Sequence, residues 1–162
     1  MFDREITGLA TEVLARCRAR GWRLATAESC TGGLVTAALT AIPGSSDVVD
    51  RGFVVYSNKA KVELLGVPET TLAAVGAVSA ETALAMAAGA VARTAADLAV
   101  SVTGIAGPGG GTGEKPVGLV YLGIATRDFS RGERHVFPGD RDAVRRAATV
   151  RALELLRAAA ES

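Results

Sequence analysis

The sequence has few of the residues from which metal sites, disulfides and aromatic recognition surfaces are built. Its 162 residues include two cysteines, one histidine and 4% aromatic residues. Cys17 and Cys30 form neither a CxxC pair nor a metal-ligand spacing, and the carboxylates show no HExxH or DxDxDG pattern. We therefore expect no metal site and no cofactor, and we interpret Cys17 as a packing residue.

The sequence also lacks an excess of charge and a long hydrophobic run. Lys and Arg number 18 and Asp and Glu 17, so a formal net charge of +1 gives no general attraction to nucleic acid or to an anionic membrane. No apolar run approaches the roughly 18 to 20 residues of a membrane helix. The N-terminal segment does not resemble a signal peptide. We expect a cytoplasmic protein without nucleic-acid or membrane partners; the sequence leaves open whether it forms a homo-oligomer.

Apolar periodicity predicts alternating helices and strands in a single domain that spans residues 1–162. The predicted helices cover residues 3–20, 34–42, 59–65, 79–94 and a last segment capped by Asp140. The predicted strands cover residues 22–27, 48–57, 98–104, 117–126 and, at an edge, part of 131–139. This order favours a three-layer α/β/α fold. Because only a loop joins residues 98–104 to 117–126, we expect a mixed sheet.

The segment AESCTGG lies between a predicted strand and a predicted helix. Ser29 is a candidate nucleophile there, because free backbone N–H groups at a helix start can stabilise an oxyanion or a phosphate. Gly32 and Gly33 let another group come close. The alternative is that Ser29 or Thr31 only caps the helix that starts near Gly32. Cys30 is the competing nucleophile, although such a cysteine is more often a small buried residue.

A nucleophilic serine needs a base, and the usual base is poorly placed in this sequence. The only histidine, His135, lies in the predicted edge strand, and neither GxSxG nor SxxK occurs. The segment YSNKAK instead offers Tyr56, Asn58 and Lys61 at the end of a predicted strand, where polar loops of α/β proteins gather. Burial can lower the pKa of Lys61 enough for it to act as the base. The alternative is that Lys59 and Lys61 are solvated on a helix surface.

A glycine-rich segment at residues 102–118 connects two predicted strands. It matches neither GxxxxGK[ST] nor GxGxxG, but its backbone amides can form an anion-binding concavity, the alternative being a flexible hairpin connection. Thr103, at the strand end, is a candidate for orienting a catalytic group. Arg141 and Arg145 lie four residues apart on the last predicted helix, so they can meet one anion or form surface ion pairs.

Five segments stand in order across about residues 26–146: TAESCTGG, GFVVYSNKAK, GAVSAET, SVTGIAGPGGGTGEKPVG and FPGDRDAVR. Together they closely resemble the CinA C-terminal family, which includes nicotinamide-nucleotide amidases. The resemblance implies an α/β fold, a cytoplasmic location and hydrolysis of nicotinamide mononucleotide to nicotinate mononucleotide and ammonia in pyridine-nucleotide recycling. Larger members carry an additional N-terminal molybdopterin-binding-like domain, which these 162 residues do not include.

The resemblance also implies roles for individual residues. Ser29 matches the nucleophile and Lys61 the base, whereas Lys59 occupies a variable position. Tyr56 and Thr103 match positions that line the site and orient this pair. The expected substrate-binding residues, which include candidates for the oxyanion and for the 5′-phosphate of a nucleotide substrate, are Cys30, Thr31, Gly32, Gly33, Asn58, Gly104, Arg141 and Arg145. Two alternatives stay open: a non-catalytic nucleotide-binding or regulatory module, and an amidase for another small amide.

Overall fold

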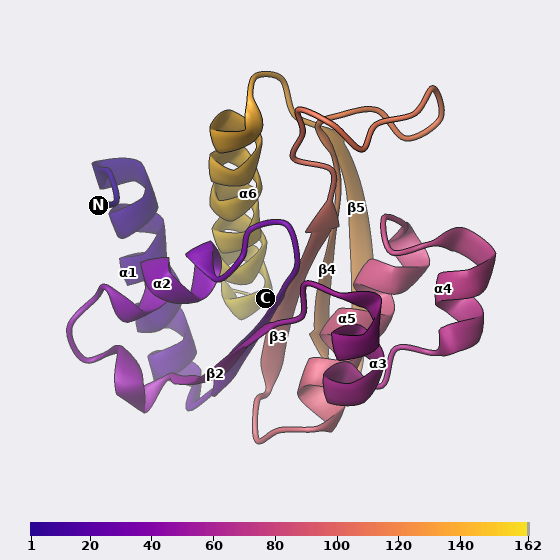
Figure 1. Cartoon of the computed structure of the whole chain (residues 1–162). Coiled ribbons are helices and arrows are strands. Elements are labelled where there is room, and N and C mark those ends of the chain that lie inside the picture. The colour runs from indigo at the N-terminus through magenta and orange to yellow at the C-terminus, as the bar shows by residue number, and fades with distance from the viewer. Residues whose placement is uncertain (162) are drawn as a thin grey trace.

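In the computed structural model, which describes residues 1–161, a five-stranded sheet lies between two layers of helices (Figure 1). The strand order is β2-β1-β3-β4-β5. In chain order the strands are β1 Leu24–Glu28, β2 Val49–Val54, β3 Leu98–Gly104, β4 Leu119–Thr126 and β5 Ser130–Val136. β1 pairs parallel with β2 and β3, whereas β4 pairs antiparallel with β3 and β5. The predicted mixed sheet and α/β class are confirmed.

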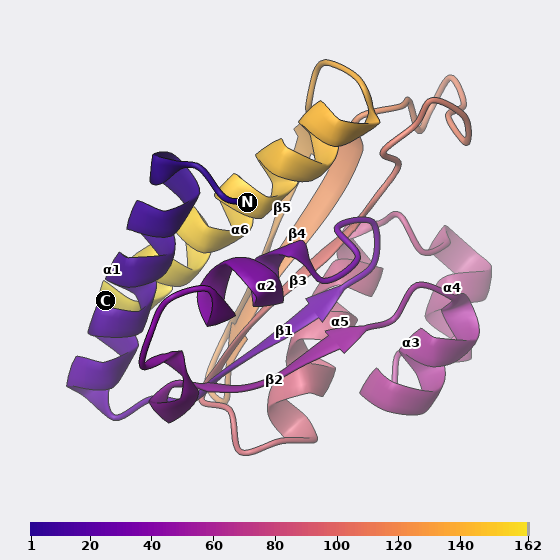
Figure 2. The ribbon, with the colours of Figure 1, turned by 60° about the vertical axis from the view of Figure 1, so that its left-hand side comes forward.

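The helices divide between the two faces of the sheet (Figure 2). One face carries α1 Arg4–Arg20, α2 Leu34–Thr40 and α6 Arg141–Glu161, and the other carries α3 Asn58–Leu65, α4 Glu69–Val75 and α5 Ala80–Ala92. A short 3-10 helix, Ser45–Asp47, precedes β2. No helix within residues 1–161 is long and apolar enough to cross a membrane.

The two faces of the sheet have side chains of different size. Alternate residues of each strand point to opposite faces, and the residues towards α1 and α6 are mostly large, as Leu98, Val100 and Val102 of β3 are. The face towards α5 carries mostly alanine. A Cβ on Gly123 of β4 would lie only 2.5 Å from the Ala83 carbonyl oxygen of α5. The alanine-rich helix α5 therefore packs unusually close to the sheet.

The main departure from the predicted elements is helix α4. The sequence predicted only a turn at residues 66–68, but Pro68 is the N-cap of α4. This helix has no fully buried residue, so it lacks the apolar stripe from which helices are predicted. Helix α2 begins at Leu34, as predicted. The two residues before it, Gly32 and Gly33, adopt left-handed backbone angles, with φ of 59° and 103°.

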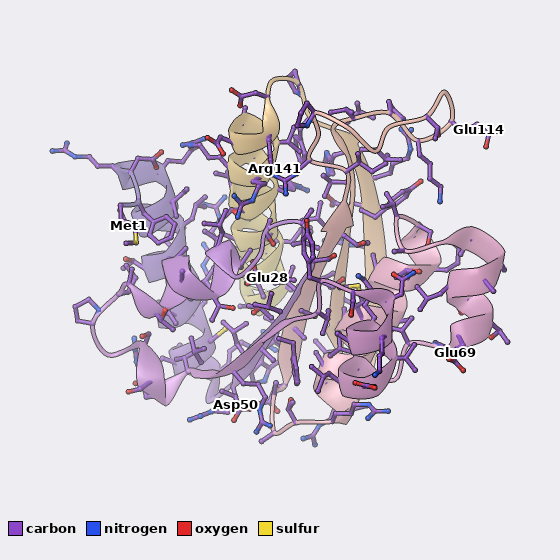
Figure 3. All side chains as sticks on the ribbon, viewed as in Figure 1. Met1, Glu28, Asp50, Glu69, Glu114 and Arg141 are labelled. Carbon is purple, nitrogen blue, oxygen red and sulfur yellow. The ribbon has the colours of Figure 1, made fainter. Side chains whose placement is uncertain are left out.

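The last helix, α6, agrees closely with its prediction. The Asp140 carboxylate accepts a 2.9 Å hydrogen bond from the Ala143 N–H, as an N-cap does. The predicted apolar line is fully buried: Val144, Ala148, Ala152 and Leu155. The cap places Arg141 at the first turn of α6, at the end of the molecule where the glycine-rich loop also lies (Figures 1 and 3).

Two glycines provide a matched test of the close approach between helices. A methyl group on Gly8, an exposed position of α1, would contact nothing within 4 Å, so Gly8→Ala should raise the free energy of unfolding by about 0.5–1 kcal/mol through helix propensity. A methyl group on Gly89, in α5, would overlap the Leu65 carbonyl oxygen at the end of α3. Gly89→Ala should lower the free energy of unfolding by about 1–3 kcal/mol. Urea denaturation measures both, and effects of the same sign would contradict the packing described.

Candidate active site

The turn that carries Ser29, which we call the serine turn, covers residues 29–33 between β1 and α2. It is built around a buried carboxylate, Glu28, at the end of β1. Glu28 Oε1 accepts hydrogen bonds from the Thr31 hydroxyl at 2.7 Å and the Val35 N–H at 2.9 Å. Glu28 Oε2 accepts from the N–H and the hydroxyl of Thr36 at 3.1 and 2.9 Å. Glu28 lies between α2 and the sheet (Figure 3), where its carboxylate satisfies the free N–H groups at the start of α2.

The alternative that Ser29 or Thr31 caps this helix is wrong. The N-cap of α2 is Gly33, which has no side chain, and the Thr31 hydroxyl donates to Glu28 rather than accepting from the helix. The strand pattern already contained a signal for Glu28, which our sequence analysis missed. Leu24, Thr26 and Glu28 alternate along β1, so the glutamate points to the same face as the buried Leu24.

Lys61 lies on α3 with its amine against Ser29. Only 1% of its surface is exposed, and Nζ is 3.2 Å from Ser29 Oγ. The same amine donates to the carbonyl oxygens of Val55 at 3.0 Å and Tyr56 at 3.3 Å. Burial lowers the pKa of Lys61 below its usual value of 10.5. A neutral amine has two N–H groups, which match the two carbonyls, and its lone pair then faces the Ser29 hydroxyl.

These two side chains lie at the wall of a pocket of about 290 Å³. The pocket is formed by the segments that follow β1, β2 and β3, by α3, by the connection between α4 and α5, and by the start of α6. The lining residues are Ser29, Cys30, Tyr56, Asn58, Lys61, Ala77, Val78, Thr103, Gly104, Ile105, Ala106, Gly107, Gly109, Gly110 and Arg141. They include no Asp or Glu, so the charged residues on the pocket wall are all basic. Of the predicted site residues, Asn58 and Gly104 are thus placed at the pocket, whereas Thr31, Gly32 and Gly33 are not among its lining residues.

Tyr56 and Thr103 both line the pocket, but neither side chain is hydrogen-bonded to Ser29 or Lys61. Tyr56 is 64% exposed and its hydroxyl accepts a 3.4 Å hydrogen bond from Arg141, while its backbone carbonyl is the part that meets Lys61. The Thr103 hydroxyl donates to the Ala77 carbonyl at 2.8 Å. Thr103 therefore holds the segment between α4 and α5 against the strand end.

The two arginines that sequence spacing grouped together have separate positions. Arg141 lines the pocket and donates to the Gly107 carbonyl of the glycine-rich loop at 2.7 Å. Arg145 does not line the pocket; it donates to the carbonyl oxygens of Cys30 at 3.1 Å and Thr31 at 3.3 Å. Arg145 thus braces the serine turn from outside, and Arg141 is the arginine that can meet a ligand.

The backbone N–H groups of the serine turn are not equivalent. The Gly32 N–H donates to the Ser29 carbonyl at 3.0 Å within the turn, which removes it from the expected oxyanion donors. No carbonyl oxygen within residues 1–161 accepts a hydrogen bond from the N–H groups of Cys30, Thr31 or Gly33. The donors that can receive a developing negative charge are therefore among these three.

The competing nucleophile and the histidine are both unsuited to the chemistry of the pocket. Burial raises the pKa of the Cys30 thiol to about 11, so the reactive thiolate is scarce at neutral pH. His135 lies on the edge strand β5, where its ring is 2.9 Å from the Glu133 carboxylate. Over residues 1–161, no three His, Cys, Asp and Glu side chains are grouped so that they could hold a metal ion.

The hydrogen bonds of Glu28 predict a large effect of a very small change. Glu28→Gln keeps the shape of the side chain but turns an NH₂ group towards N–H donors, so we expect the free energy of unfolding to fall by about 1–3 kcal/mol. The matched control is Glu63→Gln, since the Glu63 side chain is 59% exposed and forms an ion pair with Lys59 on the helix surface. It should change stability by less than about 0.5 kcal/mol. Urea denaturation decides, and equal stability of the two variants would contradict the role of Glu28.

Comparison with known proteins places this geometry in a defined family. The family model of the CinA C-terminal domain matches residues 6–160. The nicotinamide-nucleotide amidohydrolase PncC of Escherichia coli is 52% identical over 160 residues, covering 96% of this chain and 95% of that protein. A putative competence-damage inducible protein of Caldicellulosiruptor bescii is 50% identical over 157 residues, covering 97% of this chain but only 36% of that protein.

Solved structures agree with the sequence relatives. The crystal structure of the competence/damage inducible protein CihA from Agrobacterium tumefaciens has a TM-score of 0.96 and 48% identity, covering 100% of this chain and 99% of that one. A CinA superfamily protein from Klebsiella pneumoniae has a TM-score of 0.92 and 38% identity, covering 96% and 98% of the two chains.

Proposed function

This chain belongs to the CinA C-terminal domain family, and we propose that it is an amidohydrolase that converts nicotinamide mononucleotide to nicotinate mononucleotide and ammonia. The relatives named nicotinamide-nucleotide amidohydrolase, which match over nearly their whole length, support the reaction class and its place in pyridine-nucleotide recycling. A single observation carries the mechanism: the buried Lys61 amine lies 3.2 Å from the Ser29 hydroxyl at the wall of the pocket.

The first half of the reaction forms an acyl-enzyme. Neutral Lys61 takes the hydroxyl proton of Ser29 while Ser29 Oγ attacks the carboxamide carbon. The negative charge that develops on the carboxamide oxygen is received by backbone N–H groups among Cys30, Thr31 and Gly33. Protonated Lys61 then gives its proton to the amide nitrogen, the carbon–nitrogen bond breaks, and ammonia leaves. The carboxamide carbon is now esterified to Ser29.

The second half repeats the same proton transfers with water. Lys61, neutral again, takes a proton from a water molecule while the oxygen of that water attacks the ester carbon. The proton returns to Ser29 Oγ when the ester bond breaks, and the carboxylic acid formed loses its own proton to solvent and leaves as the carboxylate product. The carbonyls of Val55 and Tyr56 hold the amine in place through both halves of the reaction. They accept hydrogen bonds from two of its N–H groups whether the amine is neutral or protonated.

The charge of the pocket supports a substrate with an anionic group. No carboxylate lines the pocket, and the Arg141 guanidinium stands at its wall beside the glycine-rich loop. A phosphate at Arg141 would form charge-assisted hydrogen bonds, which gives binding energy that holds the carboxamide in attacking geometry. The positive pyridinium ring of the substrate also makes the carboxamide carbon more electrophilic. We do not propose Arg145 as a phosphate ligand, since its guanidinium donates to the Cys30 and Thr31 carbonyls of the serine turn.

Removing one side-chain heteroatom from each of two neighbouring residues tests which of them is the nucleophile. Ser29→Ala removes the attacking oxygen, so ammonia release from nicotinamide mononucleotide should fall by at least about a thousandfold, as loss of a covalent nucleophile does. Cys30→Ala, the matched control, should keep more than about a third of the activity. Circular dichroism checks that both variants fold. Near-native turnover by Ser29→Ala would refute the mechanism. A comparison with free nicotinamide as substrate tests whether the reaction needs the nucleotide portion.

The charge state of Lys61 gives a second, independent test. Lys61→Arg keeps a cation but cannot act as a base, so kcat should drop by at least about a hundredfold. Lys59→Arg, at an exposed position two residues away, should be nearly silent. In the native enzyme only neutral Lys61 is active, and burial lowers its pKa; kcat should therefore rise with pH through a midpoint below 10.5. A rate that falls with rising pH below 10 would exclude Lys61 as the base.

A further inference from the structure

The glycine-rich loop between β3 and β4 forms one wall of the pocket but has few attachments of its own. Ile105, Ala106, Gly107, Gly109 and Gly110 line the pocket. Beyond them the chain extends outward over α4 (Figure 1), and Glu114 at its tip is exposed (Figure 3). Glycines have more backbone freedom than other residues, so ordering this loop costs more conformational entropy.

The base of the loop is well fixed, whereas its outer part has a single distant attachment. Backbone hydrogen bonds of 2.8 Å join Ile105 to Leu119 and Gly118 to Ile105, and Arg141 holds the Gly107 carbonyl. Among residues 1–161, the segment 108–117 makes two hydrogen bonds to other elements: the Pro116 carbonyl accepts one from the neighbouring Leu119 N–H of β4 at 3.1 Å, and the second reaches an element distant in sequence. This second bond runs from Lys115 Nζ to the Val75 carbonyl oxygen at 2.6 Å, and it joins residues 40 positions apart.

The backbone on both sides of this bond is suited to the contact. The Lys115 N–H donates to the Thr112 hydroxyl at 3.0 Å and the Thr112 N–H donates to the Lys115 carbonyl at 2.7 Å, so a closed turn presents the lysine. Val75 is the last residue of α4, where carbonyl groups have no partner within the helix and a lysine is a favourable cap.

The segment that receives Lys115 is the other wall of the pocket. Val75 is followed by Gly76 and then by Ala77 and Val78, which line the pocket together with the loop residues. The Thr103 hydroxyl holds the Ala77 carbonyl at the strand end. Lys115 therefore connects the two walls at their outer ends, while Thr103 connects one of them to the sheet.

We propose that Lys115 is a positioning residue that fastens the glycine-rich loop to the C-terminal end of α4 and thereby fixes the shape of the pocket walls that hold the substrate. Its bond lies away from Ser29 and Lys61, which are anchored through β1 and α3. Losing it should change substrate affinity rather than the chemical step. The kinetic part of this inference rests on the proposed function, whereas the fastening itself does not.

The test compares three variants. Lys115→Met keeps a long side chain but has no donor; Lys115→Arg retains a donor; and Lys59→Met is the control at an exposed lysine whose partner is Glu63. One hydrogen bond contributes about a three- to tenfold shift in a local equilibrium. In Lys115→Met we therefore expect KM for nicotinamide mononucleotide to rise about three- to tenfold, with kcat changed less than twofold. Lys115→Arg should recover part of the loss, and Lys59→Met should match the native enzyme.

Amide hydrogen exchange of residues 108–117 is the readout that does not depend on activity. Exchange in this loop should accelerate about three- to tenfold in Lys115→Met and not in Lys59→Met, with global stability unchanged. Unaltered exchange would overturn the fastening, and faster exchange with unaltered KM would overturn its role in binding. If the native enzyme releases no ammonia from the mononucleotide, the proposed function fails. The role of Lys115 is then tested by amide hydrogen exchange together with the Kd of the same nucleotide, which takes the place of KM.

Discussion

Burial of the Lys61 amine next to Ser29 is the constraint on which the rest of the site depends. A buried ammonium without a carboxylate is costly, and no salt bridge with Lys61 occurs within residues 1–161. The surroundings therefore favour the neutral amine that a general base requires. Helix α3, which carries Lys61, packs closely against α5, where Gly89 leaves room for the Leu65 carbonyl.

Glu28 is a second buried ionisable group, but its environment is the opposite of that around Lys61. Four donors from Thr31, Val35 and Thr36 satisfy the carboxylate, as the buried charge demands. These bonds hold the serine turn from inside, and Arg145 holds it from outside through the Cys30 and Thr31 carbonyls. The turn is therefore fixed on both sides, which favours a preorganised arrangement of Ser29 and its N–H donors.

The pocket combines a rigid reactive end with walls that have fewer attachments. Ser29 and Lys61 are held by elements that pack in the core, whereas the glycine-rich loop is joined to the remainder by Arg141 and Lys115. Such a division suits the proposed reaction, in which the reacting atoms are held in strict geometry while the pocket admits a substrate that we propose to have a ring, a sugar and an anionic group. The absence of carboxylates among the lining residues fits that anionic group.

The sequence alone determined the features that depend on local pattern. Periodicity predicted the strands and most helices, because that signal is carried by neighbouring residues. The pairing of Ser29 with Lys61 came instead from the resemblance of the motifs to the CinA C-terminal family. Helix α4 escaped notice because it buries no residue. Glu28 did so because three of its four hydrogen-bond donors, from Val35 and Thr36, come close only when α2 folds back on β1. Only the tertiary structure separated Arg141 from Arg145: both lie on one helix face, but their long side chains reach different segments more than 30 residues away. Contacts across such distances depend on how the layers pack, and local sequence spacing does not contain that information.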